Sequence, residues 1–268
     1  VRKAVRISVQ RSAQNRGWSS DSIDLDDWMK IYCEARYGGY PDAMEEAWKL
    51  FRKTAYSSLY SYPRFTWQTV IPDQRRISKI DLSDDYLQAI RLYASCADEL
   101  KSSELYRNDL IEFVSYYVAA KAENFYKQAL KDDSENRVLA AQRNLQQTVD
   151  LLMDVDRLLA SHPLYRLEEW VELARNSGTT LQEKDAYEAN AKRLITSWGG
   201  IQEDYAARFW SGLIKDYYIP RIQLYFTKDR NKIREWEEQW ITSPWSNSTT
   251  PFDDPVEAAL SLIEKTNK

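Results

Sequence analysis

The feature of this sequence best suited to binding a ligand is a tryptophan beside a double glycine. Trp198 comes at the end of a helical pattern, and Gly199 and Gly200 follow it directly. A tryptophan held at such a helix end presents a flat apolar face with a polar edge, against which a sugar ring can pack. Further aromatic residues follow in the same stretch, at Tyr205, Trp210, Tyr217 and Tyr218. Residues 196–221 are therefore the candidate binding segment.

Acidic residues occur in adjacent pairs along the chain, but this spacing does not suit acid–base catalysis. Hydrolysis of a glycosidic bond generally needs two carboxyl groups that flank the bond, about 5 Å apart or more. Neighbouring residues on a helix point about 100° apart, so adjacent carboxylates diverge. The pairs are Asp26/Asp27, Glu45/Glu46, Glu168/Glu169 and Glu237/Glu238. We expect them to form solvated helix faces, and we predict no catalytic residue in this chain.

Residues that could ligate a metal or act as nucleophiles are too few to build a site. Cys33 and Cys96 are the only cysteines, and both lie in apolar helical patterns where buried free thiols are common. His162, the only histidine, cannot supply a zinc triad or a Ser/His/Asp site without partners. We assign it a charge or a hydrogen bond at a helix C-terminus. The sequence also lacks Walker, G-x-G-x-x-G, G-x-S-x-G and H-E-x-x-H motifs, so we predict no metal and no cofactor.

The composition is that of a folded protein, and it argues against nucleic acid and membrane as partners. The chain has 268 residues, 43% of them apolar, which is enough for a large core. Its 37 basic and 41 acidic residues are spread along the sequence, so no basic stripe marks a nucleic-acid binder. No run of about 18 apolar residues predicts a membrane span, and the N-terminus lacks the apolar core of a signal peptide. Export would need a signal upstream.

The elements that position these residues are expected to be helices. Glycine is scarce, with 7 residues, and apolar residues recur at spacings of three and four. The fold class is therefore all-α, a helical bundle of about eight to ten helices. Two long helices, from about Ser103 to Lys131 and through Val138 to Leu159, form its spine. We prefer this intramolecular bundle to an intermolecular coiled coil because the polar faces also carry aromatic residues.

Capping residues and prolines predict where individual helices begin and end. Asp24 and Asp42 are expected to cap the first two helices, with Gly38 and Gly39 ending the first. Thr180 to Glu183 form a capping box for a helix running to Trp198. A helix from Asp204 should be interrupted near Pro220. Between Ser57 and Asp81 the helical signal lapses, and this stretch is a candidate functional loop without obvious core residues around Tyr62 to Arg64.

Several segments together resemble one enzyme family. They are the Trp-Gly turn at 198–199, Asp204 to Ala206, Leu25 to Tyr32, Ala35 to Gly38 and Ala43 to Trp48. These segments are similar to the all-α C-terminal domain of glycoside hydrolase family 89, the α-N-acetylglucosaminidases. The likeness extends from about residue 24 to residue 226.

The resemblance implies what this chain does and what it leaves to other parts of a polypeptide. In the family the domain follows a (β/α)8 barrel that carries both catalytic glutamates. The nucleophile lies shortly before the domain in the family, and since no acidic residue precedes Asp21, the resemblance implies that it lies outside this chain. Residues 1–20 resemble the remnant of the barrel's last helix, and residues 21–268 the all-α domain. Trp198 and Tyr205 match positions that line the pocket for terminal N-acetylglucosamine, and Ile201 matches an aliphatic contact. The expected partners are the barrel of the same polypeptide and a glycan ending in N-acetylglucosamine.

Three readings of function remain open on sequence alone. The leading one is a domain that completes the sugar pocket of a periplasmic or secreted bacterial enzyme or of a lysosomal one. The second is a free-standing helical module that binds glycans or proteins through its tryptophans. The third is a domain that adds stability without touching a ligand, with Trp198 and Tyr205 as ordinary core aromatics.

Overall fold

The regular structure of this protein is helical. The computed structural model describes residues 24–57, 65–69, 83–198, 204, 207–246 and 248–266. These ranges contain eleven α-helices, against the eight to ten expected, and one isolated bridge between Arg166 and Ser211. The prediction of an all-α helical bundle is confirmed. Residues 1–20, predicted to be the remnant of a preceding domain, lie outside the described residues.

The helices follow the chain in a simple order. They are α2 (Leu25–Tyr37), α3 (Asp42–Lys53), the 3-10 helix η1 (Thr66–Gln68), α4 (Asp84–Ser95), α5 (Ala97–Leu100), α6 (Glu104–Ser134), α7 (Val138–Leu159), α8 (Leu167–Asn176), α9 (Leu181–Leu194), the π-helix η4 (Ile214–Tyr218), α10 (Ile219–Tyr225), α11 (Arg230–Thr242) and α12 (Pro255–Lys265). No helix among the described residues is long and apolar enough to cross a membrane.

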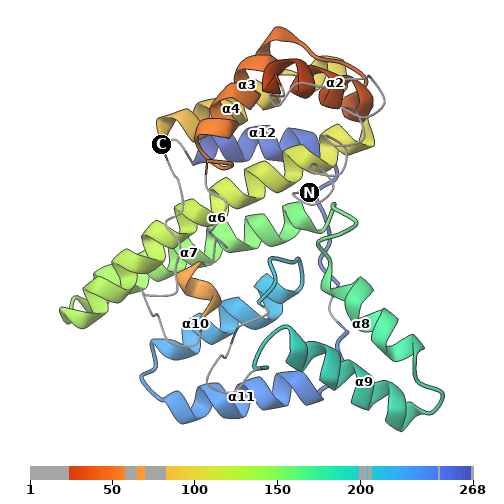
Figure 1. The fold of residues 1–268 in the computed structure, drawn as a ribbon. Coiled ribbons are helices and arrows are strands. Elements are labelled where there is room, and N and C mark those ends of the chain that lie inside the picture. Colours follow the sequence, from red (N-terminus) through yellow and green to blue (C-terminus); the bar gives the residue numbers. More distant parts are fainter. Residues whose placement is uncertain are drawn as a thin grey trace.

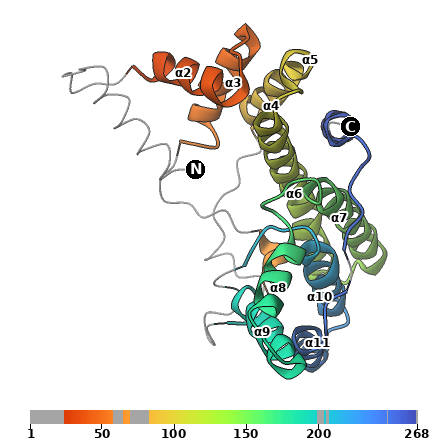
Figure 2. The same cartoon turned by 90° about the vertical axis from the view of Figure 1, so that its right-hand side faces the viewer.

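Helices α6 and α7 pack along each other and form the spine of the molecule. In Figure 1, α2, α3, α4 and α12 lie on one side of this pair and α8 to α11 on the other. The second view shows the same division, with the α8–α9 hairpin beside α10 and α11 (Figure 2). The arrangement confirms the predicted spine and divides the molecule into two groups of helices.

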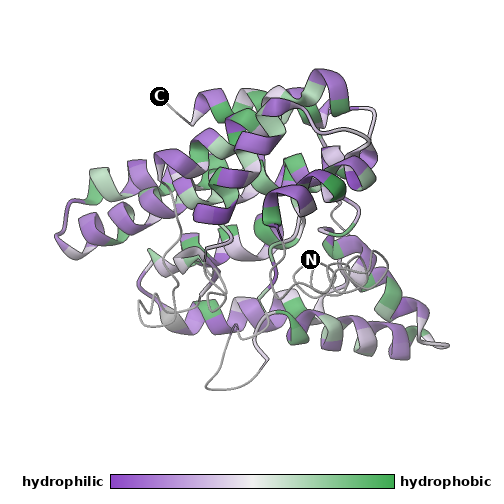
Figure 3. Ribbon diagram, turned by 45° about the horizontal axis from the view of Figure 1, so that its top comes forward, coloured by the Kyte–Doolittle hydropathy of each residue, from purple (hydrophilic) through white to green (hydrophobic). Residues whose placement is uncertain are grey.

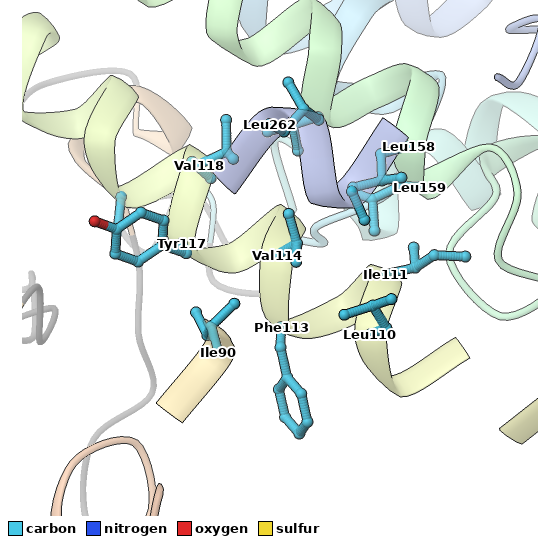
Figure 4. Packing of buried hydrophobic residues seen from close by; sticks show 14 of the residues in the cluster. Ile90, Leu110, Ile111, Phe113, Val114, Tyr117, Val118, Leu158, Leu159 and Leu262 are labelled. Carbon is cyan, nitrogen blue, oxygen red and sulfur yellow. The ribbon is translucent and has the colours of Figure 1, made fainter. Parts of the chain in front are cut away.

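The core follows α6 because neighbours cover this helix on several sides. Figure 4 shows Val114 and Val118 of α6 facing Leu262 of α12, while Leu158 and Leu159 come from α7. All five side chains are buried. Most other helices are amphipathic, and Figure 3 shows apolar and polar residues alternating along them. An amphipathic helix buries its apolar stripe against the core and turns its polar face to water.

Local capping fixes several helix ends as expected. Asp24 Oδ1 accepts hydrogen bonds from the backbone N–H groups of Asp26 and Asp27, at 2.9 and 3.1 Å, and so begins α2. Gly38 ends that helix in the left-handed conformation, with φ 87°. Asp42 is an exception, because it is the first residue of α3 and Pro41 occupies the capping position without a side-chain hydrogen bond.

The segment before Pro220 differs from the prediction. The expected helix does not start at Asp204: that residue is a turn, and residues 207–210 have no regular structure. The chain instead enters the π-helix η4, and the N–H of Ile219 bonds to the carbonyl of Ile214. Pro220 then lies in the first turn of α10, where its missing N–H costs nothing. The helix therefore continues through Pro220 to Tyr225, and the change from π-helix to α-helix at Ile219 replaces the interruption predicted near Pro220.

The cysteines and the histidine are buried. Burial raises the pKa of the Cys33 thiol to about 12 and that of Cys96 to about 11, as expected for inert core thiols. His162 follows α7, and its Nδ1 accepts a hydrogen bond from the Leu164 N–H at 3.1 Å. Burial lowers the pKa of His162, which favours the neutral ring. Of the two roles predicted for His162, a charge or a hydrogen bond, the hydrogen bond is present and the lowered pKa disfavours the charge.

Candidate functional site

Trp198 lies just beyond the end of α9. The capping box that begins this helix is confirmed: Glu183 N–H donates to Thr180 Oγ1 at 3.2 Å, and Thr180 N–H donates to Glu183 Oε2 at 3.1 Å. The helix ends at Leu194, four residues earlier than predicted. The N–H of Trp198 still bonds to the carbonyl of Arg193, at 3.0 Å. Trp198 is 46% exposed, so it is not a core residue.

The chain returns to the end of α9 at Asp204. The backbone N–H of Asp204 donates to the carbonyl of Thr196 at 3.1 Å, and the Thr196 hydroxyl donates to the carbonyl of Lys192 at 2.7 Å. Asp204 has φ 63°, in the left-handed region that non-glycine residues other than Asn and Asp seldom adopt. Thr196 and Asp204 are both buried. Thr196, two residues before Trp198, is therefore hydrogen-bonded to Asp204.

One buried guanidinium holds Asp204. Arg221, from α10, is 2% exposed, and its Nη1 lies 2.8 Å from Asp204 Oδ1 and 3.1 Å from Glu237 Oε1 of α11. Its Nη2 donates to the carbonyl of Gln68 at 2.7 Å. Burial alone lowers the pKa of Arg221, but the nearby carboxylates of Asp204 and Glu237 outweigh it and raise the pKa above its usual value. We call Arg221, Asp204, Glu237 and Tyr217 the Arg221 cluster.

Glu237 corrects the expectation that both members of each acidic pair are solvated. Glu238 is exposed and pairs with Arg193 at 2.7 Å, but Glu237 is buried and accepts a hydrogen bond from the Tyr217 hydroxyl at 2.8 Å. The spacing contained a signal, because Glu237 lies four residues from both Ile233 and Ile241, which are buried. A helix buries residues at this spacing on one face.

The stretch from Ser57 to Asp81, expected to be a functional loop, contains a buried anchor at residues 65–68. Residues Phe65 to Gln68 are all at most 3% exposed, and Phe65 stacks on Trp67 with ring centroids 4.9 Å apart. Glu123 of α6 accepts a hydrogen bond from the Thr66 N–H at 2.8 Å and a second one from the Thr66 hydroxyl. Tyr62, Pro63 and Arg64 lie outside the described residues. The prediction for Tyr62 to Arg64 is therefore not tested, whereas the neighbouring residues 65–68 belong to the core.

A second buried carboxylate fixes the start of the π-helix. Asp156 Oδ1 accepts hydrogen bonds from the N–H groups of Gly212 and Lys215, at 2.8 and 3.0 Å, and its Oδ2 accepts one from the Thr249 hydroxyl at 2.6 Å. Burial raises the pKa of Asp156, and these hydrogen bonds oppose the rise. Because its oxygens are already occupied by donors, Asp156 anchors the segment that leads from Trp210 into η4.

Of the three predicted substrate-binding residues, the structure describes only Trp198. Asp204 is hydrogen-bonded to Thr196, two residues before Trp198, and Arg221 of α10 and Tyr217 of η4 join Asp204 in the Arg221 cluster. Tyr205 and Ile201, the other two predicted substrate-binding residues, lie outside the described residues. Sequence reasoning missed Arg221. Its spacing of three and four residues from Tyr218 and Tyr217, which are fully buried, was the sequence pattern that indicated a buried position for Arg221.

Comparisons with known proteins match nearly the whole chain. Residues 28–265 match the family model described as the alpha-N-acetylglucosaminidase C-terminal domain. Human alpha-N-acetylglucosaminidase is 29% identical over 282 residues, which cover 93% of this chain and 37% of the human protein.

Solved structures of a family 89 glycoside hydrolase from Clostridium perfringens share the fold. The complex with PUGNAc superposes with a TM-score of 0.79 at 23% identity, over 92% of this chain and 32% of that one. A second complex, with its substrate GlcNAc-alpha-1,4-galactose, gives a TM-score of 0.80 at 22% identity, over 93% and 32%. This chain spans about a third of the length of these relatives.

Proposed function

Because this chain belongs to the family of alpha-N-acetylglucosaminidase C-terminal domains, we propose that it completes the sugar pocket of an enzyme that removes terminal α-linked N-acetylglucosamine from glycans. In this proposal it packs on a (β/α)8 catalytic barrel of the same polypeptide. The observation that carries the proposal is the half-exposed ring of Trp198, held at the end of α9 and tied through Thr196 to a buried cluster. The complexes of the Clostridium relative with PUGNAc and with a GlcNAc disaccharide support the ligand class.

Trp198 contributes binding rather than bond chemistry. An indole ring is neutral and flat, so it packs against the apolar face of a pyranose and leaves the sugar's hydroxyls to other partners. Tyr205 is proposed to offer a hydroxyl to the sugar and Ile201 an aliphatic contact. The carboxyl groups that protonate the leaving oxygen and attack the sugar carbon come from the barrel in this proposal.

The proposal extends to where the enzyme works. Its substrate is a glycan that ends in N-acetylglucosamine, and we place the polypeptide in the periplasm or outside a bacterial cell, or in the lysosome of a eukaryotic cell. The support is the family membership alone. Secretion of the full-length gene product, followed with a tagged copy in the source cell, tests this placement.

The kinetic test replaces Trp198 in the full-length gene product. Trp198→Ala removes a stacking surface that is worth on the order of 1 to 3 kcal/mol, so kcat/KM for an aryl α-N-acetylglucosaminide should fall roughly tenfold to hundredfold. Since stacking acts on the bound substrate as well as on the transition state, most of the loss should be a rise in KM. The 268-residue chain alone should not turn the substrate over.

A matched control separates the pocket wall from any exposed aromatic. Tyr187 lies on α9, the helix that precedes Trp198, and is 44% exposed, close to the 46% of Trp198. Tyr187→Ala should therefore leave kcat/KM within about twofold of wild type, since surface substitutions away from a site have small effects. Wild-type kinetics in folded Trp198→Ala enzyme would remove Trp198 from the sugar pocket. Turnover by the 268-residue chain, abolished by changing one of its own carboxylates, would refute the division of roles.

A further inference from the structure

We infer that Arg221 is a positioning residue that fixes the orientation of Trp198 through its ion pair with Asp204. The inference rests on the proposed role of Trp198 in sugar binding, and it assigns to α10 a part in that role. Arg221 itself touches no ligand in this proposal. It acts on Trp198, the proposed pocket wall, through Asp204 and Thr196.

A continuous set of hydrogen bonds leads from Arg221 to Trp198. Arg221 Nη1 donates to Asp204 Oδ1 at 2.8 Å, and the Asp204 backbone N–H donates to the Thr196 carbonyl at 3.1 Å. Thr196 is two residues before Trp198, whose own N–H is bonded to Arg193 at 3.0 Å. The backbone around Trp198 is thus held from two sides, by the end of α9 and by the Arg221 cluster.

The arrangement of the Arg221 cluster favours positioning over a gain in stability. The side chains of Arg221 and Asp204 are each 2% exposed, and removing two charges from water offsets much of their mutual attraction. What an arginine adds is geometry, because its planar fork bonds several acceptors in fixed directions. Here it joins three parts of the chain that meet nowhere in sequence: Gln68 of η1, Asp204, and Glu237 of α11.

Asp204 occupies a backbone conformation that needs such support. Its φ of 63° lies in the left-handed region, which costs a non-glycine residue free energy unless its surroundings fix it. The ion pair to Arg221 and the N–H bond to Thr196 supply that support. The direction of the Trp198 ring depends in part on the backbone that carries it, and this backbone is bonded to Asp204 through Thr196.

The first test observes Trp198 directly and needs no activity. The chain contains 10 tryptophans, and ¹⁹F NMR of 5-fluorotryptophan-labelled protein resolves them, with Trp198 assigned from the Trp198→Phe variant. Asp204→Asn removes the charge but keeps a residue that tolerates positive φ. Arg221→Lys keeps the charge but replaces the fork with a point charge. Both variants should shift or broaden the Trp198 resonance.

A control variant breaks a partly buried ion pair far from this cluster. Asp109 of α6 pairs with Arg36 at 2.6 Å and accepts a hydrogen bond from the Tyr37 hydroxyl at 2.6 Å. Asp109→Asn should destabilise the fold without moving the Trp198 resonance. An unchanged Trp198 resonance in folded Asp204→Asn protein would overturn the inference, as would an equal shift in Asp109→Asn.

The second test is a double-mutant cycle in the full-length enzyme. Asp204→Asn alone should lower kcat/KM roughly tenfold, mainly through KM, because a misplaced binding group loses much of its effect. In the Trp198→Ala background the same change should cost less than about twofold, since the residue it acts on is gone. Losses that multiply in the double variant would refute positioning. If Trp198→Ala alone leaves kcat/KM unchanged, the proposed function fails, and the NMR test still decides the positioning inference.

Discussion

Two tryptophans near the Arg221 cluster should respond very differently to truncation. Trp67, in η1, is fully buried and packs against Phe65 and Tyr218, with ring centroids 4.9 and 5.5 Å away. Trp198 is 46% exposed. Trp67→Ala and Trp198→Ala remove the same atoms, so the difference between their effects on the free energy of unfolding reports how far each ring is buried in the core.

The magnitudes follow from burial. Truncating a buried tryptophan to alanine costs about 3 to 5 kcal/mol, which includes the cavity that is left behind. The indole Nε1 of Trp67 is buried without a hydrogen-bond partner within the described residues, and deleting such a group recovers part of the loss. We expect about 3 kcal/mol for Trp67→Ala. Trp198 leaves nearly half its surface in water and leaves no closed cavity, so we expect about 1 to 2 kcal/mol.

Equilibrium unfolding in urea, followed by circular dichroism at 222 nm, measures both values by linear extrapolation. Equal m-values in the two variants and wild type would establish that the same structure unfolds. A loss above about 3 kcal/mol for Trp198→Ala would make Trp198 a core residue and refute the reasoning that its ring forms part of an exposed pocket wall. A loss below about 1 kcal/mol for Trp67→Ala would refute the buried anchor at residues 65–68.

Two further predictions concern the anchor at Thr66 and the neutral His162. The Thr66 amide donates to Glu123, so in the wild-type chain its hydrogen exchange should be as slow as that of the amides of α6. Glu123→Gln should speed the exchange of the Thr66 amide at least tenfold relative to the amides of α6. Fast exchange of this amide in the wild type would contradict the anchor. Burial lowers the pKa of His162 below its usual value of 6.5, so as the pH falls the unfolded chain takes up this proton before the folded one does. The free energy of unfolding should therefore decrease as the pH drops below about 6.5, with a slope of at most about 1.4 kcal/mol per pH unit. His162→Asn keeps an acceptor for the Leu164 N–H and should remove this part of the pH dependence in urea unfolding; the same slope in both proteins would show that other groups cause it.

The sequence by itself determined the features of this protein that depend on near neighbours along the chain. The cap at Asp24, the capping box from Thr180 to Glu183 and the left-handed Gly38 are all present where the residue types indicated. Each rests on bonds that span at most four residues, and their energetics depend little on the rest of the fold. The repeat of apolar residues along α6 and α7 likewise identified the spine, because helical periodicity alone shows which faces must be buried.

Tertiary structure alone decided how the candidate site is held together. Arg221 meets Gln68, from which it is separated by 153 residues, and Thr66 meets Glu123 across 57 residues. No local pattern encodes such pairs, because a buried charge is tolerable only where packing brings donors and acceptors from several segments to one point. For Glu237, the spacing from Ile233 and Ile241 indicated the buried face, but only the tertiary structure supplies the Tyr217 hydroxyl and the Arg221 guanidinium that bond its carboxylate there. Trp198 could be picked out by its type and its glycine neighbours, but its exposure depends on where α9 ends and on what Asp204 is bonded to.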